Sequence, residues 1–222
     1  MRVHHIPVRR NMPVLVPESL VAQLPQTICI CANAQFLHEL PRVQEPLEAS
    51  GRTVLLYQPR HTQHAGQILG CSTDVMDAPA FLFIGEGLFH PQALAYANEA
   101  PVYLYDPVNQ KTGLVDREEI ERRKKKREAG IKLFYASKHI GVLLSTKSGQ
   151  KDEIAVKRLR AEHPEKQFYV FLGNTLDLSG LEDFPFVDVW LNTACPRIGY
   201  DDIYKTQKPL VNAEDVLSKH RF

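Results

Sequence analysis

The sequence lacks any long uninterrupted hydrophobic run, although 44% of its 222 residues are hydrophobic. No apolar stretch approaches the roughly 20 residues that a membrane-spanning helix needs. The N-terminal segment 1–17 has neither the apolar centre nor the small-residue cleavage site of a signal peptide. We therefore expect a folded cytoplasmic protein that buries a substantial core and does not bind membranes.

The chain also lacks an excess of charge of either sign, because 27 basic side chains balance 26 acidic ones. No global field draws the protein to nucleic acid, so direct nucleic-acid binding is not expected. One dense charged run, REEIERRKKKRE at 117–128, begins with acids and ends with bases. This order suits the dipole of a solvated helix. An RNA-binding tract is the alternative interpretation.

Cysteine is scarce, and the four residues present form neither a C-x-x-C pair nor a zinc-finger spacing. A chain without a secretory signal keeps its thiols reduced, so a disulfide framework is not expected. The spacing also excludes a metal site built from one local motif. Any metal site that uses these cysteines must be assembled by the fold.

Short apolar runs of strand length alternate with segments of helical periodicity, which is typical of parallel α/β domains. Strands are predicted within 26–34, 52–58, 79–87, 100–107, 140–149, 166–174, 187–194 and 208–212, and a closing helix within 213–220. The organisation that follows is an extended lead-in at 1–24, a first α/β domain at 25–113, a connecting helix at 114–139 and a second α/β domain at 140–222.

The two halves show the same order of predicted strands and helices. APVYLYDP in the first half corresponds to KPLVNAED in the second, and DAPAFLFIGEGLFHP corresponds to FVDVWLNTACPR. We interpret this order as an internal duplication that gives two repeated small parallel-sheet domains. The alternative is that two unrelated α/β domains share the same order.

The four cysteines fall into two classes. Cys71 and Cys195 lie in loops marked by glycine or proline beside predicted strand ends, where open α/β sheets bind ligands. Cys29 and Cys31 lie inside the apolar run TICICA, and we interpret them as small buried hydrophobes rather than ligands. The two loop thiols are candidate ligands or reactive groups, but an iron-sulfur cluster normally uses three or four.

A second group of candidates is polar. The turn STKSGQ carries Lys147 before a predicted helix and is either an anion site or a plain turn. His90 either caps a helix start or has a functional role. Arg197 could pair with a carboxylate of a cofactor and Asp201 with Asp202 could hold further polar groups, or all three form ordinary ion pairs.

Five segments carry a resemblance to a known family: GQILGCST, FLFIGEGLFHPQALA, PVYLYDP, LLSTKSGQ and WLNTACPRI. In this order and at these intervals the chain resembles the diphthamide synthase family. The resemblance implies three homologous α/β domains, each giving one cysteine to a central 4Fe-4S cluster that binds S-adenosylmethionine. It makes this chain similar to the second and third domains, with Cys71 and Cys195 as the metal ligands. The first domain of the family is then missing.

The same resemblance implies transfer of a 3-amino-3-carboxypropyl group from S-adenosylmethionine to a histidine of translation elongation factor 2. It makes Ser145, Thr146, Lys147 and Gln150 expected partners of the methionyl or ribose part of the cofactor, and Arg197 is the further candidate for its carboxylate. A homo- or heterodimer with a subunit that supplies the missing domain would complete the site. The alternative is a non-catalytic or truncated paralogue that supports a partner's cluster or relays electrons. A nucleotide-binding module is disfavoured, because CANAQF lacks the G-x-G-x-x-G fingerprint.

Overall fold

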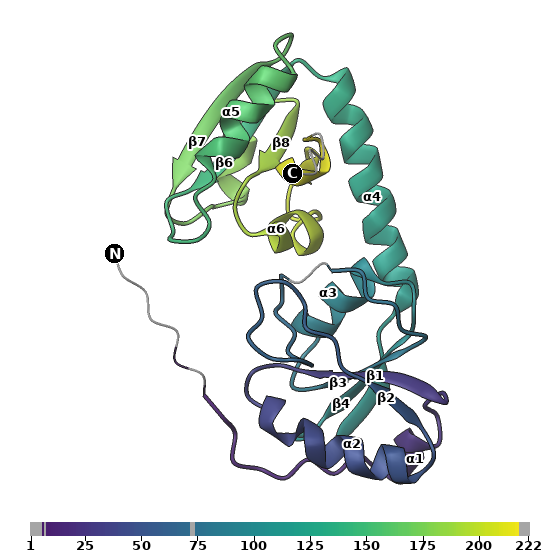
Figure 1. Ribbon diagram of the computed structural model, residues 1–222. Coiled ribbons are helices and arrows are strands. Elements are labelled where there is room, and N and C mark those ends of the chain that lie inside the picture. Colours follow the sequence, from purple (N-terminus) through teal and green to yellow (C-terminus); the bar gives the residue numbers. More distant parts are fainter. Residues whose placement is uncertain (1–5, 7, 72–73, 218–222) are drawn as a thin grey trace. The chain divides into compact units, whose positions relative to one another are not determined.

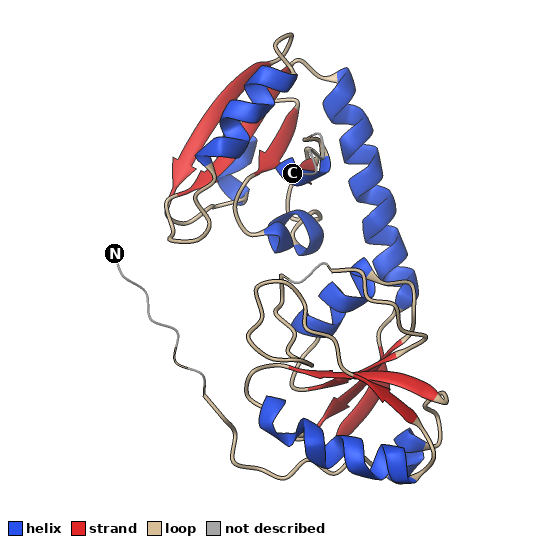
Figure 2. Ribbon diagram, in the orientation of Figure 1, coloured by secondary structure: helices blue, strands red, loops and turns tan. Residues whose placement is uncertain are grey.

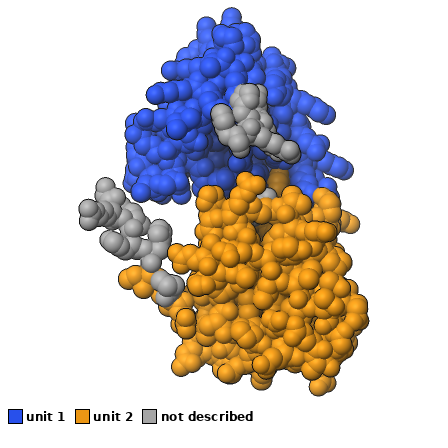
Figure 3. Space-filling view, viewed as in Figure 1, with its two compact units in different colours: residues 1–3, 121–222 blue, residues 4–120 orange. Residues whose placement is uncertain are grey.

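The computed structural model describes residues 6, 8–71 and 74–217 (Figure 1). The chain forms two compact units, an N-terminal unit of residues 4–120 and a C-terminal unit of residues 121–222 (Figure 3). In the described part of the chain no helix combines the length and the apolar composition needed to cross a membrane.

The N-terminal unit is built on a five-stranded sheet with the order β2-β1-β3-β4-β5 (Figure 2). Its strands are β1 (Thr27–Ala32), β2 (Thr53–Leu55), β3 (Phe81–Ile84), β4 (Val102–Asp106) and β5 (Lys111–Leu114). The first four are parallel, and β5 pairs antiparallel with β4. Strand β5 was not predicted from the sequence, because its four residues are exposed and carry no apolar run.

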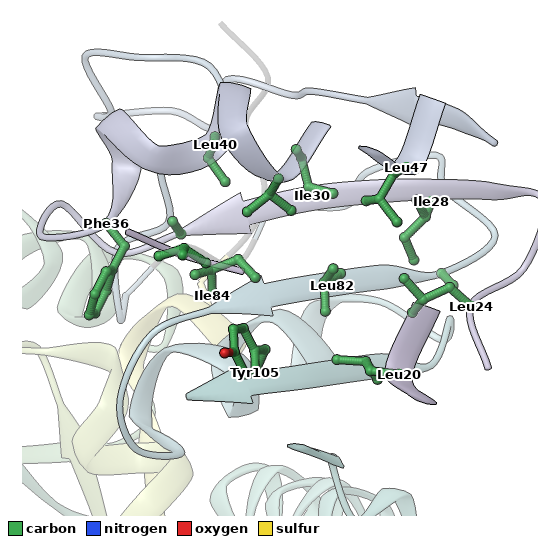
Figure 4. Packing of buried hydrophobic residues seen from close by; sticks show 14 residues of the cluster. Leu20, Leu24, Ile28, Ile30, Phe36, Leu40, Leu47, Leu82, Ile84 and Tyr105 are labelled. Carbon is green, nitrogen blue, oxygen red and sulfur yellow. The ribbon is translucent and has the colours of Figure 1, made fainter. Parts of the chain in front are cut away.

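Helices cover both faces of this sheet. They are α1 (Glu18–Val21), α2 (Leu40–Ala49), which follows a 3-10 turn η1 (Leu37–Glu39), and α3 (Phe89–Ala97). Alternation along β1 separates the two faces: Ile28 and Ile30 pack with α2 (Figure 4), whereas Cys29 and Cys31 pack with α3. A parallel sheet buried on both faces needs this continuous apolar run.

Part of the expected lead-in contributes to the core of the N-terminal unit. Val14, Leu20 and Leu24 are at most 5% exposed and belong to the cluster that joins β1 to α2. The backbone N–H of Val14 also donates to Oε2 of Glu39 over 3.1 Å. The segment from residue 14 onward is therefore packed onto this unit, which its proline-rich composition did not indicate.

The C-terminal unit has a four-stranded, fully parallel sheet with the order β7-β6-β8-β9. Its strands are β6 (His139–Ser145), β7 (Gln167–Gly173), β8 (Val189–Asn192) and β9 (Leu210–Asn212). The helices are α4 (Arg117–Ala136), which begins in the N-terminal unit, α5 (Glu153–Glu162), α6 (Pro196–Asp201) and the 3-10 turns η2 (Ser179–Asp183) and η3 (Ala213–Asp215). The charged run 117–128 forms the first part of α4.

The expected closing helix at 213–220 differs from the structure. Only the 3-10 turn η3 forms at its start, and residues 218–220 lie outside the described part of the chain. Ala213 and Val216 are nevertheless buried against the sheet of the C-terminal unit. The apolar residues on which the helix prediction rested are therefore explained here by their burial against the sheet.

The two units share one topology. When strands are counted within each unit, both sheets run second-first-third-fourth, and β5 is an addition to the first. β3 and β8 are the third strands, and β4 and β9 are the fourth, as the sequence correspondence requires. The predicted α/β class with parallel-sheet units is confirmed, and the shared strand order supports an internal duplication.

Trp190 lies at the centre of one face of the C-terminal sheet. It is the only tryptophan in the sequence, and its side chain is fully buried. Its ring packs on Gly141 of the neighbouring strand, where an added Cβ would lie 2.3 Å from Cζ3 of Trp190. Glycine at this position therefore makes room for the indole, and tryptophan fluorescence will report on this unit alone.

We predict that Leu191→Ala lowers the free energy of unfolding of the C-terminal unit by about 2–5 kcal/mol, the usual cost of a large-to-small change in a core. Leu191 is 0% exposed in the sheet, whereas Leu172 on the edge strand β7 is 62% exposed. Leu172→Ala is therefore the matched control and should change stability little. Denaturant unfolding followed by Trp190 fluorescence measures both, and equal effects would contradict the packing described.

Candidate functional site

In each unit, the candidate residues lie in segments that follow the carboxyl ends of parallel strands. In open α/β sheets the carboxyl ends of the strands lie at one edge, and ligands bind in the loops that follow them. The N-terminal unit presents the segment around Cys71 after β2, and the C-terminal unit presents 145–150 after β6 and 193–197 after β8. Each of these segments is fixed by different contacts.

Cys71 is exposed and lies in the long connection between β2 and β3. Before the connection reaches Cys71, it is hydrogen-bonded to the sheet. Ala32 at the end of β1 exchanges backbone hydrogen bonds with Gly66 and Ile68 over 2.8 and 2.9 Å. Gly70 then passes so close to the ring of Phe89 that a Cβ would lie 1.8 Å from Cε1. The glycine before Cys71 thus allows a close approach to the start of α3.

His90 lies in the first turn of α3 and packs between aromatic rings. Its ring stacks on Phe83 of β3 with centroids 5.9 Å apart and meets Phe89 edge-on at 5.4 Å. The N-cap of α3 is Leu88, without a side-chain cap hydrogen bond, so these ring contacts give His90 a packing role rather than the capping role expected from the sequence. A functional role for His90 stays a prediction.

Cys195 is half-buried and precedes α6 as its N-cap residue. The preceding strand β8 ends at Asn192, whose Nδ2 donates to the carbonyl of Cys195 over 2.8 Å. Thr193 is bonded to β6 in addition, since its Oγ1 and its backbone N–H both donate to the carbonyl of Leu143. The loop that carries Cys195 is therefore held by the two neighbouring strands.

The turn at 145–150 follows β6 at the same edge. Ser145 is buried, and its Oγ accepts the backbone N–H of Lys147 over 3.1 Å, while Gly149 adopts a positive φ of 77°. The following helix α5 has its own cap, because Asp152 accepts the N–H of Ala155 over 2.9 Å. One N–H of the first turn of α5 is therefore taken by this cap, and Lys147 is exposed in the preceding turn. The anion site stays a prediction.

Thr146 and Gln150 complete the turn. The N–H of Thr146 donates to the carbonyl of Gly173 on β7 over 3.0 Å, and the N–H of Gln150 closes on the carbonyl of Lys147 over 3.1 Å. Thr146 is exposed and Gln150 is half-buried. Their proposed contact with a cofactor stays a prediction.

Arg197 is buried and ion-paired within its own helix. Its Nε and one Nη lie 2.7 Å from Oδ2 of Asp201, and the other carboxylate oxygen of Asp201 lies 3.1 Å from Arg123 of α4. Asp202 pairs with Lys205 over 2.8 Å. The structure thus contains the ion pairs that the sequence analysis gave as the alternative, and a cofactor contact of Arg197 is untested.

Cys29 and Cys31 lie inside the strand β1, not in the loop that follows it. Burial raises the pKa of the Cys29 thiol to about 11 and raises the pKa of Cys31 well above its usual value. Both side chains are at most 2% exposed. A thiol with a raised pKa is rarely a thiolate near neutral pH, so these two are poor ligands and poor nucleophiles.

The structure brings 145–150 and 193–197 to the same edge of one sheet, because β6 and β8 are paired neighbours. Cys71 belongs to the other unit, so a meeting of its sulfur with that of Cys195 stays a prediction. Within the described residues, no group of three or more His, Cys, Asp or Glu side chains is arranged to hold a metal ion.

Two residues of this edge were not singled out from the sequence. Asn192 and Asn212 end β8 and β9, and each is 2% exposed. A signal was present, since VWLN and PLVN are apolar strands that each finish on asparagine. Buried amides need hydrogen-bond partners, so asparagines at these two strand ends indicate side-chain hydrogen bonds at this edge of the sheet.

The chain matches the sequence model of the diphthamide synthesis protein family over residues 1–217. It is 32% identical over 203 residues to the 2-(3-amino-3-carboxypropyl)histidine synthase of Pyrococcus horikoshii, and the match covers 88% of this chain and 58% of that protein. The enzyme of the same name from Methanocaldococcus jannaschii is 36% identical over 67% of this chain and 44% of its own length. Subunit 1 of the Schizosaccharomyces pombe synthase is 26% identical over 88% of this chain and 48% of its own length.

The fold is similar to solved structures as well. The crystal structure of Dph2 from Pyrococcus horikoshii with a 4Fe-4S cluster superposes with a TM-score of 0.73 and 29% identity, covering 90% of this chain and 58% of that one. A second crystal structure of that protein gives a TM-score of 0.74. The chain thus spans roughly half the length of the relatives it matches.

We predict two classes of thiol reactivity in the native protein at about pH 8. Iodoacetamide should label exposed Cys71 and half-buried Cys195 first, while Cys29 and Cys31 react only on unfolding, because the thiolate is the reactive form. Peptide mass spectrometry over time measures each site. Labelling of Cys29 or Cys31 in the native state as fast as Cys71 would contradict the burial described.

Proposed function

Because the chain belongs to the diphthamide synthesis protein family, we propose that it takes part in transferring the 3-amino-3-carboxypropyl group from S-adenosylmethionine to a histidine of translation elongation factor 2. The observation that carries the proposal is the division of the thiols. Within the 217 matched residues, the two accessible thiols, Cys71 and Cys195, lie one in each unit. The remaining two are buried in β1.

We propose that Cys71 and Cys195 each supply one thiolate to a 4Fe-4S cluster. An accessible thiol in a loop at a strand end fits the soft-sulfur donor that iron-sulfur clusters use. One donor from each unit also fits a cluster that different domains share. When bound, the cluster would supply the electron that opens a carbon-sulfur bond of S-adenosylmethionine.

The residues of the C-terminal unit would hold the cofactor. Lys147 is exposed at the strand-end turn, and its ammonium would attract the carboxylate of the methionyl group. The same turn also contains the hydroxyl groups of Ser145 and Thr146 and the amide of Gln150, which would donate hydrogen bonds to the cofactor. Arg197 would add a second cation, with its guanidinium orientation fixed by the ion pair to Asp201.

Two thiolates leave a four-iron cluster short of protein ligands. Among the described residues, no three His, Cys, Asp or Glu side chains are grouped so that they could hold a metal ion. We therefore propose that a further ligand comes from a segment or subunit outside these 222 residues, in a homo- or heterodimer. The assembly would act in the cytoplasm on elongation factor 2. The 222-residue chain by itself would hold a cluster weakly, because an exposed, under-ligated cluster is lost to oxygen or chelators.

We predict that Cys71→Ala and Cys195→Ala each reduce cluster binding and transferase activity, whereas Cys29→Ala, a matched control at a buried thiol, retains both. The assay is anaerobic reconstitution with a partner that supplies the family's first domain. Iron, acid-labile sulfide and the visible spectrum report the cluster, and labelling of elongation factor 2 reports transfer.

Two outcomes would contradict this scheme. Modification of elongation factor 2 at the original rate by the Cys71→Ala, Cys195→Ala double variant would refute the ligand assignment. A stable four-iron cluster with turnover in the isolated chain would refute the ligand deficit. In that second case Cys29, Cys31 or a non-cysteine group such as His90 would have to be a ligand.

A further inference from the structure

Two buried asparagines lie side by side at the carboxyl edge of the C-terminal sheet. Asn192 ends β8 and Asn212 ends β9, and the two residues are in-register partners across these parallel strands. Nδ2 of Asn192 donates to Oδ1 of Asn212 over 2.7 Å. The two amides therefore act as one hydrogen-bonded pair.

This pair holds the backbone on both sides of Cys195. Oδ1 of Asn192 accepts the N–H of Ala194 over 3.0 Å, and its Nδ2 donates to the carbonyl of Cys195 over 2.8 Å. Nδ2 of Asn212 donates to the carbonyl of Pro196 over 2.9 Å. Three consecutive residues are thus fixed by side chains that water does not reach, where a broken hydrogen bond leaves an unsatisfied buried group.

Helix α6 packs directly against the same pair through Gly199. A Cβ on Gly199 would lie 2.3 Å from Oδ1 and 2.5 Å from Cγ of Asn212. Only glycine lets the helix that follows Cys195 approach the amide so closely. The residue types at positions 192, 199 and 212 therefore depend on one another, because the glycine leaves space for the two paired amides.

The fold itself does not require this pair. At the last in-register position of its third and fourth strands, the N-terminal unit has Ile84 and Tyr105. The same topology therefore forms without an amide pair. The difference is that the strand end of the C-terminal unit leads directly to Cys195.

We propose that Asn192 and Asn212 are positioning residues that hold the Cys195 thiol where it ligates a metal cluster. The ligand role of Cys195 rests on the proposed function, whereas the positioning of its backbone rests on the hydrogen bonds above. Loss of a group that orients a metal ligand typically lowers metal affinity by about 10- to 100-fold. A ligand loop fixed in advance also needs no ordering when the metal binds.

The test measures how fast iodoacetamide alkylates Cys195 in the full-length native chain. Asn212→Ala removes the donor to Pro196 and the acceptor of Asn192, and Gly199→Ala crowds the pair without deleting any of its atoms. Both variants should raise the rate at Cys195 by about fivefold, because loss of a buried hydrogen bond shifts local opening by that factor.

Two controls show whether the effect is specific. Cys71 lies in the other unit, and its rate should not change. Thr193→Val removes the hydroxyl bond to Leu143 but keeps the backbone N–H bond to the same carbonyl and every bond to residues 194–196, so it should leave the Cys195 rate unchanged. Unaltered alkylation in both amide-pair variants, or an equal rise in Thr193→Val, would overturn the proposal.

A measurement on the unmodified protein keeps the proposal testable if a variant fails to fold. By NMR, the side-chain amide protons of Asn192 and the backbone N–H of Ala194 should exchange with solvent far more slowly than the side-chain amide of exposed Asn174. Equally fast exchange would show that the amide pair does not hold this loop.

Iron retention separates the proposal from the function on which it rests. In the reconstituted assembly, Asn212→Ala should lose iron to a chelator about tenfold faster than the unmodified protein. If Cys195→Ala leaves iron content intact, the ligand role and the proposed function fail even where alkylation confirms the positioning. If Cys195→Ala removes the iron while Asn212→Ala loses it at the original rate, only the positioning role fails.

Discussion

Burial of the parallel strands on both faces is the constraint on which the rest of the structure depends. Along β1, Ile28 and Ile30 fill one face and Cys29 and Cys31 fill the other, so no side chain of this strand interior remains for chemistry. The same holds for β8, where Leu191 and Trp190 occupy opposite faces. Reactive groups can then lie only beyond the strand ends, where the chain leaves the sheet.

This constraint explains how much the sequence could predict. Apolar runs identified every parallel strand. The central strands β1, β3, β6 and β8 are apolar along most of their length because they are buried on both faces, and the edge strands β2 and β7 keep an apolar run although they are partly exposed. The exposed strand β5 has no such signature, and it forms because its backbone pairs with β4. Packing of Val14 and Leu24 onto the core was also not predictable, since it depends on the tertiary course of an irregular segment.

The candidate site was predictable only in part, for a related reason. The class of each cysteine follows from its position inside or after an apolar run, and the burial of Cys29 and Cys31 agrees with that reasoning. The amide pair of Asn192 and Asn212 needs the pairing of β8 with β9, which no local pattern contains. Likewise, the ion pair between Arg197 and Asp201 is a local contact at i and i+4, but its link to Arg123 depends on the fold.

Comparison of the two units shows that the candidate ligands do not occupy repeated positions. Cys71 precedes the third strand of its sheet, whereas Cys195 follows the third strand of the other. The two units share their layers and their strand order, because these are fixed by core packing. The loops at the carboxyl edge differ between the two units. The C-terminal unit accordingly fixes its loop with buried amides, while the N-terminal unit fixes its loop through backbone bonds from Ala32 and the close contact of Gly70 with Phe89. Two different devices thus hold one accessible thiol each on the same architecture.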